Sequence, residues 1–172
     1  MQKAIVAVTS AIVLAAVVSL MAEGAKMKIT SSVFQEGGDI PLKFSRDGQD
    51  INPALRIEGI PSSVKSLLLI MDDPDAPVGL FTHWLVWNID PKTTEIAEKS
   101  VPKGAVPGTN DYPTLGYGGP QPPSGTRRYY FKIFALDQTL DLKAGAKRAE
   151  VDAAMRGHVI AQGQLMGRYS KK

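Results

Sequence analysis

The chain contains no cysteine. This absence excludes disulfide bonds, thiolate catalysis, cysteine-ligated zinc and lipoprotein acylation. The chain also lacks a strong excess of one charge, because 20 basic residues stand against 17 acidic residues and leave a net charge of +3. A nucleic-acid-binding protein normally carries a clustered basic face, whereas the Lys and Arg residues here are scattered along the sequence. We therefore expect no nucleic-acid partner.

Several motifs of catalysis and cofactor binding are also missing. The sequence has no G-x-S-x-G elbow, no P-loop, no G-x-G-x-x-G and no H-E-x-x-H. It has only two histidines, His83 and His158, and His158 falls on the apolar side of a predicted helix. A metal hydrolase would thus have a single plausible histidine ligand, which is too few for a usual zinc site. We expect no metal and no cofactor.

The first 24 residues differ in composition from the rest. Lys3 supplies a positive charge, residues 4–21 are almost entirely apolar, and residues 22–24 (Ala-Glu-Gly) offer small side chains to a signal peptidase. We expect residues 1–24 to be an export signal that directs the protein to the periplasm or the exterior. The alternative is an uncleaved N-terminal membrane anchor, because about 18 apolar residues approach the length that spans a bilayer. The remaining residues, 26–172, form one predicted domain.

The predicted domain is rich in β-strands. The whole chain has a hydrophobic content of 44%, enough for a sizeable core, and its 12 prolines and 16 glycines indicate many turns. The continuous apolar run at 67–71 predicts a strand that is buried on both faces. A helix is predicted near residues 148–161 from helical spacing of apolar residues. The predicted strands are 28–33, 40–44, 52–57, 64–71, 83–89, 127–136 and 164–169.

Residues 72–88, DDPDAPVGLFTHWLVWN, are the most informative segment. Asp72, Asp73 and Asp75 precede an apolar strand, although one Asp with Pro or Gly would suffice for a turn. In this strand, simple alternation would place His83 on the same face as Leu85 and Trp87. A carboxylate beside a histidine fixes the ring and stabilises imidazolium.

Asp73, Asp75 and His83 therefore form a candidate site. Such a group could hold an anion, act as acid and base, or share a metal. The alternative is a turn in which the Asp side chains accept hydrogen bonds from backbone amides while His83 belongs to the core.

A second informative segment is the irregular stretch from Pro102 to Gly125. Irregular stretches of this length inside a compact domain are unusual and often functional. Tyr112, Leu115 and Tyr117 are spaced through it as potential anchors. We interpret the segment as an ordered binding loop, with a disordered linker as the alternative.

The end of this loop and the next strand supply further candidates for a binding site. Gly119, with Pro120 beside it, would let a ligand approach the backbone closely. Arg127 and Tyr129 share one face of the predicted strand, and Arg is the preferred planar donor to phosphate and carboxylate. One pocket could use both side chains; alternatively, Arg127 is a solvent-exposed charge and Tyr129 a core residue.

Three segments together resemble the phosphatidylethanolamine-binding protein family. D-P-D-A-P at 73–77, followed by T-H-W-L-V-W-N-I at 82–89, is similar to the first signature of that family. G-P-Q-P-P-S-G-T-R-R-Y-Y-F-K-I-F-A-L-D at 119–137 is similar to the second, and G-H-V-I-A-Q-G-Q-L-M-G-R-Y at 157–169 resembles the closing segment. The G-Y-G-G-P loop resembles the prokaryotic, Raf-kinase-inhibitor-like branch.

The resemblance implies a mostly β fold, with a large central antiparallel-rich sheet, a smaller packed sheet and a short C-terminal helix. It also implies a small pocket for anions such as phosphate, acetate or a phospholipid headgroup. Asp73 would orient His83, and His83 with backbone amides near Gly119 would donate to the anion. The implied pocket residues are Asp73, Asp75, His83, Gly119, Pro120 and Tyr129.

Arg127 departs from the family pattern, which usually has histidine at this position. Arg127 could remain in the pocket and strengthen anion binding, or swing out and leave a single histidine there. A pair between Arg127 and Asp75 could also close the site.

The expected function is that of an exported, non-enzymatic binding protein for a phosphate-like anion or a phospholipid headgroup, which could also modulate a protein partner. One alternative is a hydrolase that uses Asp73 and His83 as acid and base. Another is a protein-interaction module that uses the Pro102–Gly125 loop. Contact with a membrane is expected only through residues 1–24, if they are not cleaved.

Overall fold

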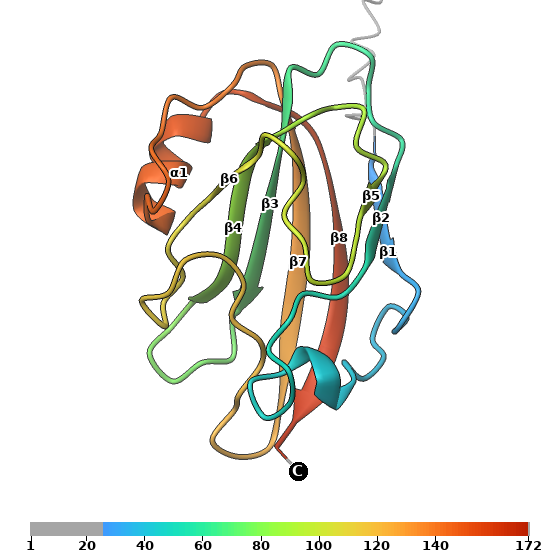
Figure 1. Ribbon diagram of the computed structural model, residues 1–172, viewed down its shortest axis with the longest axis vertical. Helices are drawn as coiled ribbons and strands as arrows, with labels where there is room; N and C mark the ends of the chain where they lie inside the picture. The colour runs from blue at the N-terminus through green and yellow to red at the C-terminus, as the bar shows by residue number, and fades with distance from the viewer. Residues whose placement is uncertain (1–25, 172) are drawn as a thin grey trace, which may run out of the picture.

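The computed structural model describes residues 26–171, which form two antiparallel sheets and one short α-helix (Figure 1). This architecture confirms the predicted mostly β fold; the expected signal peptide lies outside the described residues. The small sheet has the order β1 (Lys28–Ser31), β2 (Leu55–Glu58) and β5 (Glu95–Ile96). The large sheet has the order β6 (Val106–Pro107), β4 (Phe81–Ile89), β3 (Ser66–Asp73), β7 (Thr126–Leu136) and β8 (Val159–Ser170).

The central strand β3 separates two apolar cores. All of its residues are buried, which confirms the prediction of a strand buried on both faces. Leu67 and Leu69 face the core between the two sheets, whereas Leu68 and Ile70 face the core under helix α1 (Arg148–Met155). In Figure 1, α1 and the small sheet lie on opposite sides of β3 and β7.

No helix within residues 26–171 is long and apolar enough to cross a membrane.

The predicted elements differ most from the structure at residues 40–44 and at residues 156–163, where β8 begins at Val159 rather than at 164. Residues 40–44 do not form a strand; instead Leu42–Phe44 is a 3₁₀ turn, η1. Pro41 precedes it with φ −61° and has no N–H to donate to a strand ladder. Helix α1 ends at Met155 rather than near 161, because Gly157 takes a left-handed φ of 82° and turns the chain into β8.

A β-bulge redirects His83. Met71 pairs with Trp84 but Asp72 pairs with Thr82, so His83 is the extra residue of β4. Bulges re-aim side chains and are frequent beside functional sites. The His83 ring consequently packs against Tyr129 on the side of the sheet opposite α1. The prediction that His83 shares a face with Leu85 and Trp87 was therefore wrong, since those two side chains belong to the core under α1.

Candidate functional site

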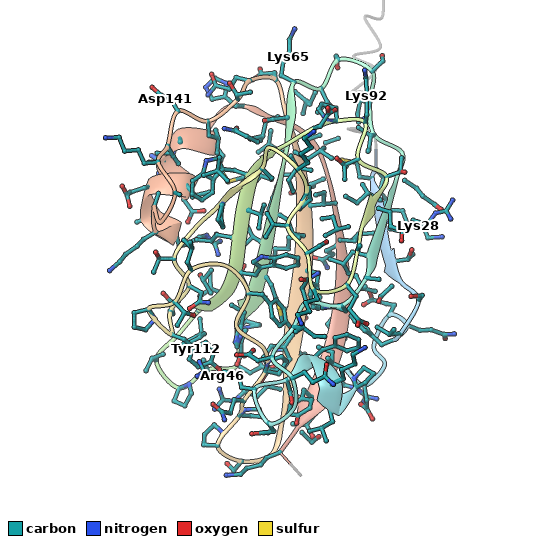
Figure 2. The ribbon with its side chains drawn as sticks, viewed as in Figure 1. Lys28, Arg46, Lys65, Lys92, Tyr112 and Asp141 are labelled. Carbon is teal, nitrogen blue, oxygen red and sulfur yellow. The ribbon has the colours of Figure 1, made fainter. Side chains whose placement is uncertain are left out.

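A pocket of about 220 Å³ opens where β3 ends and β4 and β7 begin. Figure 2 marks this end of the molecule with Tyr112 and Arg46. Four of the predicted site residues line it, whereas Asp75, Gly119 and Pro120 do not. The lining residues are Asp73, Ala76, Pro77, Val78, Phe81, His83, Tyr112, Gln121, Pro123, Arg127 and Tyr129.

A larger hollow of about 710 Å³ lies elsewhere, beside Arg56, Asp90 and Lys92. None of its lining residues is a buried polar or charged residue, whereas the smaller pocket contains two, Asp73 and His83. Buried polar groups carry a desolvation cost and are typical of functional sites. The smaller pocket is therefore the candidate site.

Asp72 does not belong to this pocket. Its side chain is fully buried on the α1 side of the sheet, where Lys132 Nζ lies 2.9 Å from one carboxylate oxygen and the Arg148 guanidinium contacts the other. The ion pairs of Asp72 thus connect α1 and β7 to the end of β3, and the role of Asp72 is structural.

Asp73 and Asp75 each pair with a different arginine. The Asp73 carboxylate, 2% exposed, accepts a hydrogen bond from Arg127 Nη1 at 3.1 Å. Asp75 is held outside the pocket by Arg128, which donates to its two oxygens at 2.6 and 2.9 Å. These hydrogen bonds from Arg128 lower the pKa of Asp75 to about 2. The position of Asp75 thus does not support the expectation that it binds the ligand. Arg127 forms its ion pair with Asp73 and not with Asp75.

Arg127 remains in the pocket. Its side chain is only 14% exposed and lines the cavity beside Tyr129. Its single hydrogen bond within residues 26–171 runs from Nη1 to Asp73. The guanidinium therefore still has Nε and Nη2 to offer to a planar or tetrahedral oxyanion.

The His83 ring is oriented by a backbone carbonyl. Nδ1 lies 2.7 Å from the Gly118 carbonyl oxygen, which can only accept, so Nδ1 carries the proton and Nε2 is left for a ligand. The Asp73 oxygens instead accept from Arg127 and from the Asp75 N–H. The prediction that Asp73 orients His83 was therefore wrong. Burial lowers the pKa of His83, opposed by the hydrogen bond to Gly118 and by the Asp73 charge.

Tyr129 offers a polar group on the pocket wall. Its hydroxyl is buried and has no hydrogen-bond partner within the described part of the chain. Burial, together with the nearby Asp73 charge, raises its pKa, so the hydroxyl keeps its proton. Buried polar groups nearly always have partners, which makes this hydroxyl a candidate donor to a ligand.

Sequence reasoning missed the aromatic surround of His83. Phe81 and Tyr112 lie 4.9 and 5.4 Å from the His83 ring, centroid to centroid, and both line the pocket. Phe81 stands two residues before His83, so strand alternation places both side chains on one face. The sequence predicts Tyr112 only as an anchor of the 102–125 loop.

The Pro102–Gly125 loop is ordered and packs against the body of the domain. The hydroxyl of the half-buried Tyr117 donates to the Phe44 carbonyl at 2.7 Å, and Thr109 pairs with Leu115 across a short bridge. The Gly119 N–H donates to Asp50 Oδ1 at 2.6 Å. The Gly119 N–H therefore already has an acceptor, contrary to the expectation that it donates to an anion.

The comparisons with known proteins identify the family. The family model described as "Phosphatidylethanolamine-binding protein" matches residues 30–170. The chain belongs to the phosphatidylethanolamine-binding protein family. This membership confirms the resemblance that the signatures indicated, and it supports a binding-protein role.

Individual relatives in the phosphatidylethanolamine-binding protein family are similar over most of the chain. A UPF0098 protein of Pyrococcus horikoshii is 51% identical over 83% of this chain and 76% of its own length. A UPF0098 protein of Methanothermobacter thermautotrophicus is 45% identical over 84% of this chain and 99% of its own.

Solved structures agree with this assignment. The crystal structure of CT736, described as a phosphatidylethanolamine-binding protein homolog from Chlamydia trachomatis, matches with a TM-score of 0.82 and 40% identity. That match covers 86% of this chain and 99% of CT736. Escherichia coli YbcL, described as a member of the mammalian family, matches with a TM-score of 0.81 and 28% identity, over 86% of this chain and all of YbcL (100%).

Gly119 is predicted to be intolerant of any side chain. An alanine Cβ at this position would lie 2.4 Å from the Phe44 carbonyl oxygen and 2.8 Å from Ser45 Cα, which are backbone atoms that cannot move aside cheaply. We expect Gly119→Ala to reduce the free energy of unfolding by about 2 kcal/mol, measured by urea denaturation. Gly125→Ala is the control, because no atom lies near its Cβ and only its φ of 67° is unfavourable. Equal losses in the two variants would contradict the packing argument.

Proposed function

We propose that this chain is a binding protein for a small oxyanion, namely a phosphate group that is free or part of a phospholipid headgroup. The observation that carries the proposal is the unpartnered, buried Tyr129 hydroxyl on a pocket wall shared with Arg127 and His83. An O–H, a guanidinium edge and a ring nitrogen converging on about 220 Å³ suit an oxyanion with several acceptor oxygens.

The charge of the pocket decides how the anion is held. Asp73 and Arg127 neutralise each other at 3.1 Å. A buried, neutral His83 adds no charge, and its Nε2 without a proton would face the anion with a lone pair. When His83 is protonated, Nε2–H becomes a charge-assisted donor. We therefore propose that anion binding is coupled to uptake of a proton by His83.

This coupling predicts that affinity rises as the pH falls. Since the pKa of His83 lies below its ordinary value of 6.5, most His83 rings are neutral at pH 7 and each binding event must protonate one. Affinity should increase by up to about tenfold per pH unit on lowering the pH towards the His83 pKa. Calorimetric titration with sulfate, whose own charge stays constant over this range, isolates the contribution of the protein.

The variant His83→Gln provides the control for this titration. It should bind sulfate more weakly and with a nearly flat pH profile, because Arg127 stays protonated throughout. An equally flat profile for the unaltered protein would show that Arg127 alone carries the charge, and would contradict proton coupling.

We also propose that the binding protein acts without turnover of its ligand. For Asp73 and His83 to act as an acid–base pair, the Asp73 carboxylate would first have to give up its hydrogen bonds from Arg127 and from the Asp75 N–H. Hydrolysis of a phosphate ester that disappears in Asp73→Asn would overturn this part of the proposal.

Export is proposed on residues 1–24 alone, and N-terminal sequencing of the mature protein from intact cells tests it.

A further inference from the structure

A single peptide group lies between His83 and a carboxylate from another part of the chain. The Gly118 carbonyl accepts from His83 Nδ1–H at 2.7 Å, and the Gly119 N–H donates to Asp50 Oδ1 at 2.6 Å. The carbonyl of Gly118 and the N–H of Gly119 belong to the same planar unit. Asp50, the peptide and His83 therefore form one continuous hydrogen-bonded chain.

The surrounding backbone holds this arrangement in place. Asp50 takes a left-handed φ of 53°, a conformation that Asp and Asn tolerate better than most residues. Its own N–H donates to the Ser45 carbonyl at 3.0 Å. Gly119 packs so closely on Phe44 and Ser45 that no Cβ fits. Asp50 and the Gly118–Gly119 peptide are thus both held in place by the turn at residues 44–50.

We propose that Asp50 is a positioning residue for His83 and acts through the Gly118–Gly119 peptide. A carboxylate that accepts from the N–H polarises the peptide and makes its carbonyl a stronger acceptor. The stronger carbonyl fixes the Nδ1–H tautomer, directs Nε2 towards the pocket and stabilises the imidazolium form. The inference rests on the proposed function only in assigning Nε2 to the anion.

Other charged and titratable groups also surround the His83 ring. Strand β3 contributes Asp73, with the Asp72 charge on the other side of the sheet. Strand β7 contributes Arg127 and Tyr129, and the 102–125 loop contributes Tyr112, with Arg46 4.0 Å above the Tyr112 ring. Asp73 is the carboxylate that shares the pocket with His83, but it is bonded to Arg127. Asp50 thus takes the orienting role that the family resemblance implies for Asp73.

The variant Asp50→Asn tests the proposal in the full-length protein. Asn tolerates the left-handed φ and can still accept from the Gly119 N–H, so the geometry is kept while the charge is removed. Nitrogen-15 NMR reports the tautomer and pKa of each histidine ring. The chain has only two histidines, and His158, paired with Asp137 at 2.8 Å, serves as an internal reference.

We expect Asp50→Asn to lower the pKa of His83 and to leave that of His158 unchanged. The effect is modest, because the Asp50 side chain is 38% exposed and its charge is partly screened. Asp50→Gly, which permits the φ but removes the acceptor, should also let the Nε2–H tautomer appear. Phosphate affinity at pH 6 should fall about threefold in Asp50→Asn, because the variant weakens the hydrogen bond that orients His83 without removing a group that contacts the anion.

The matched control is Asp47→Asn. Asp47 lies in the same turn but accepts from Gln121 and Tyr169 rather than from the peptide. An unchanged or raised His83 pKa in Asp50→Asn, or an equal decrease in Asp47→Asn, would overturn the proposal. The NMR measurements are made without ligand, so a failure of phosphate to bind would contradict the proposed function and leave the role of Asp50 to be decided by the His83 pKa.

Discussion

Replacing Arg127 with methionine is expected to weaken phosphate binding at pH 7 by at least about thirtyfold, because it truncates one partner of a buried charge pair. The variant loses the guanidinium donors at the pocket. It also leaves the Asp73 carboxylate, 2% exposed, without its cation 3.1 Å away. The pocket thereby changes from neutral to negative and repels an anion. Calorimetric titration with inorganic phosphate measures the loss.

Arg128→Met is the matched control for this prediction. Arg128 is adjacent in sequence but pairs with Asp75 and does not line the pocket. Its removal should change phosphate affinity by less than about twofold, as for an exposed ion pair. The double variant Asp73→Asn/Arg127→Met should recover part of the loss, because it removes the unpaired carboxylate. Equal effects of Arg127→Met and Arg128→Met would show that only the overall charge matters.

Replacing Asp72 with asparagine is expected to reduce the free energy of unfolding by about 3 kcal/mol, the low end for breaking a buried ion pair. Asp72 is fully buried between Lys132 and Arg148, and the isosteric change leaves two cations facing each other without a carboxylate. The low end applies because the Lys132 and Arg148 side chains are 29% and 23% exposed and can reach water. Urea denaturation provides the measurement.

Asp152→Asn is the comparison for Asp72→Asn. Asp152 accepts from the same guanidinium at 2.7 Å, but its side chain is 46% exposed. We expect a loss below about 1 kcal/mol, as for surface pairs. If the two variants lose the same stability, burial is not what makes the Asp72 cluster important.

The mostly β fold was predicted from the resemblance of the two signatures to a known family, and the buried strand β3 from its apolar run at 67–71. The structure brings the predicted site residues Asp73, His83, Arg127 and Tyr129 together where β3 ends and β4 and β7 begin. Continuous burial and strand alternation are local signals that a sequence displays directly.

The hydrogen-bond partners within the site could not be predicted in the same way. Asp72, Asp73 and Asp75 looked like one cluster, but strand alternation and the following turn send them to three places, each with its own arginine. The bulge that redirects His83 leaves no mark in the sequence, since one extra residue in a ladder depends on register.

The pairing of His83 with the Gly118 carbonyl depends on a long-range approach of two segments. Asp50 is 33 residues from His83 in sequence, and its hydrogen bond to the Gly119 N–H depends on the packing of Gly119 on Phe44 and Ser45. Local patterns report which residues are buried, whereas such contacts arise from tertiary packing alone.

The most direct test of the binding proposal is a phosphate titration followed by NMR at pH 6. The binding account predicts saturable shifts of the His83 ring signals towards the imidazolium form, shifts of Tyr129 signals, and unchanged His158 signals. Unchanged His83 signals at millimolar phosphate, or equal shifts at both histidines, would contradict the account.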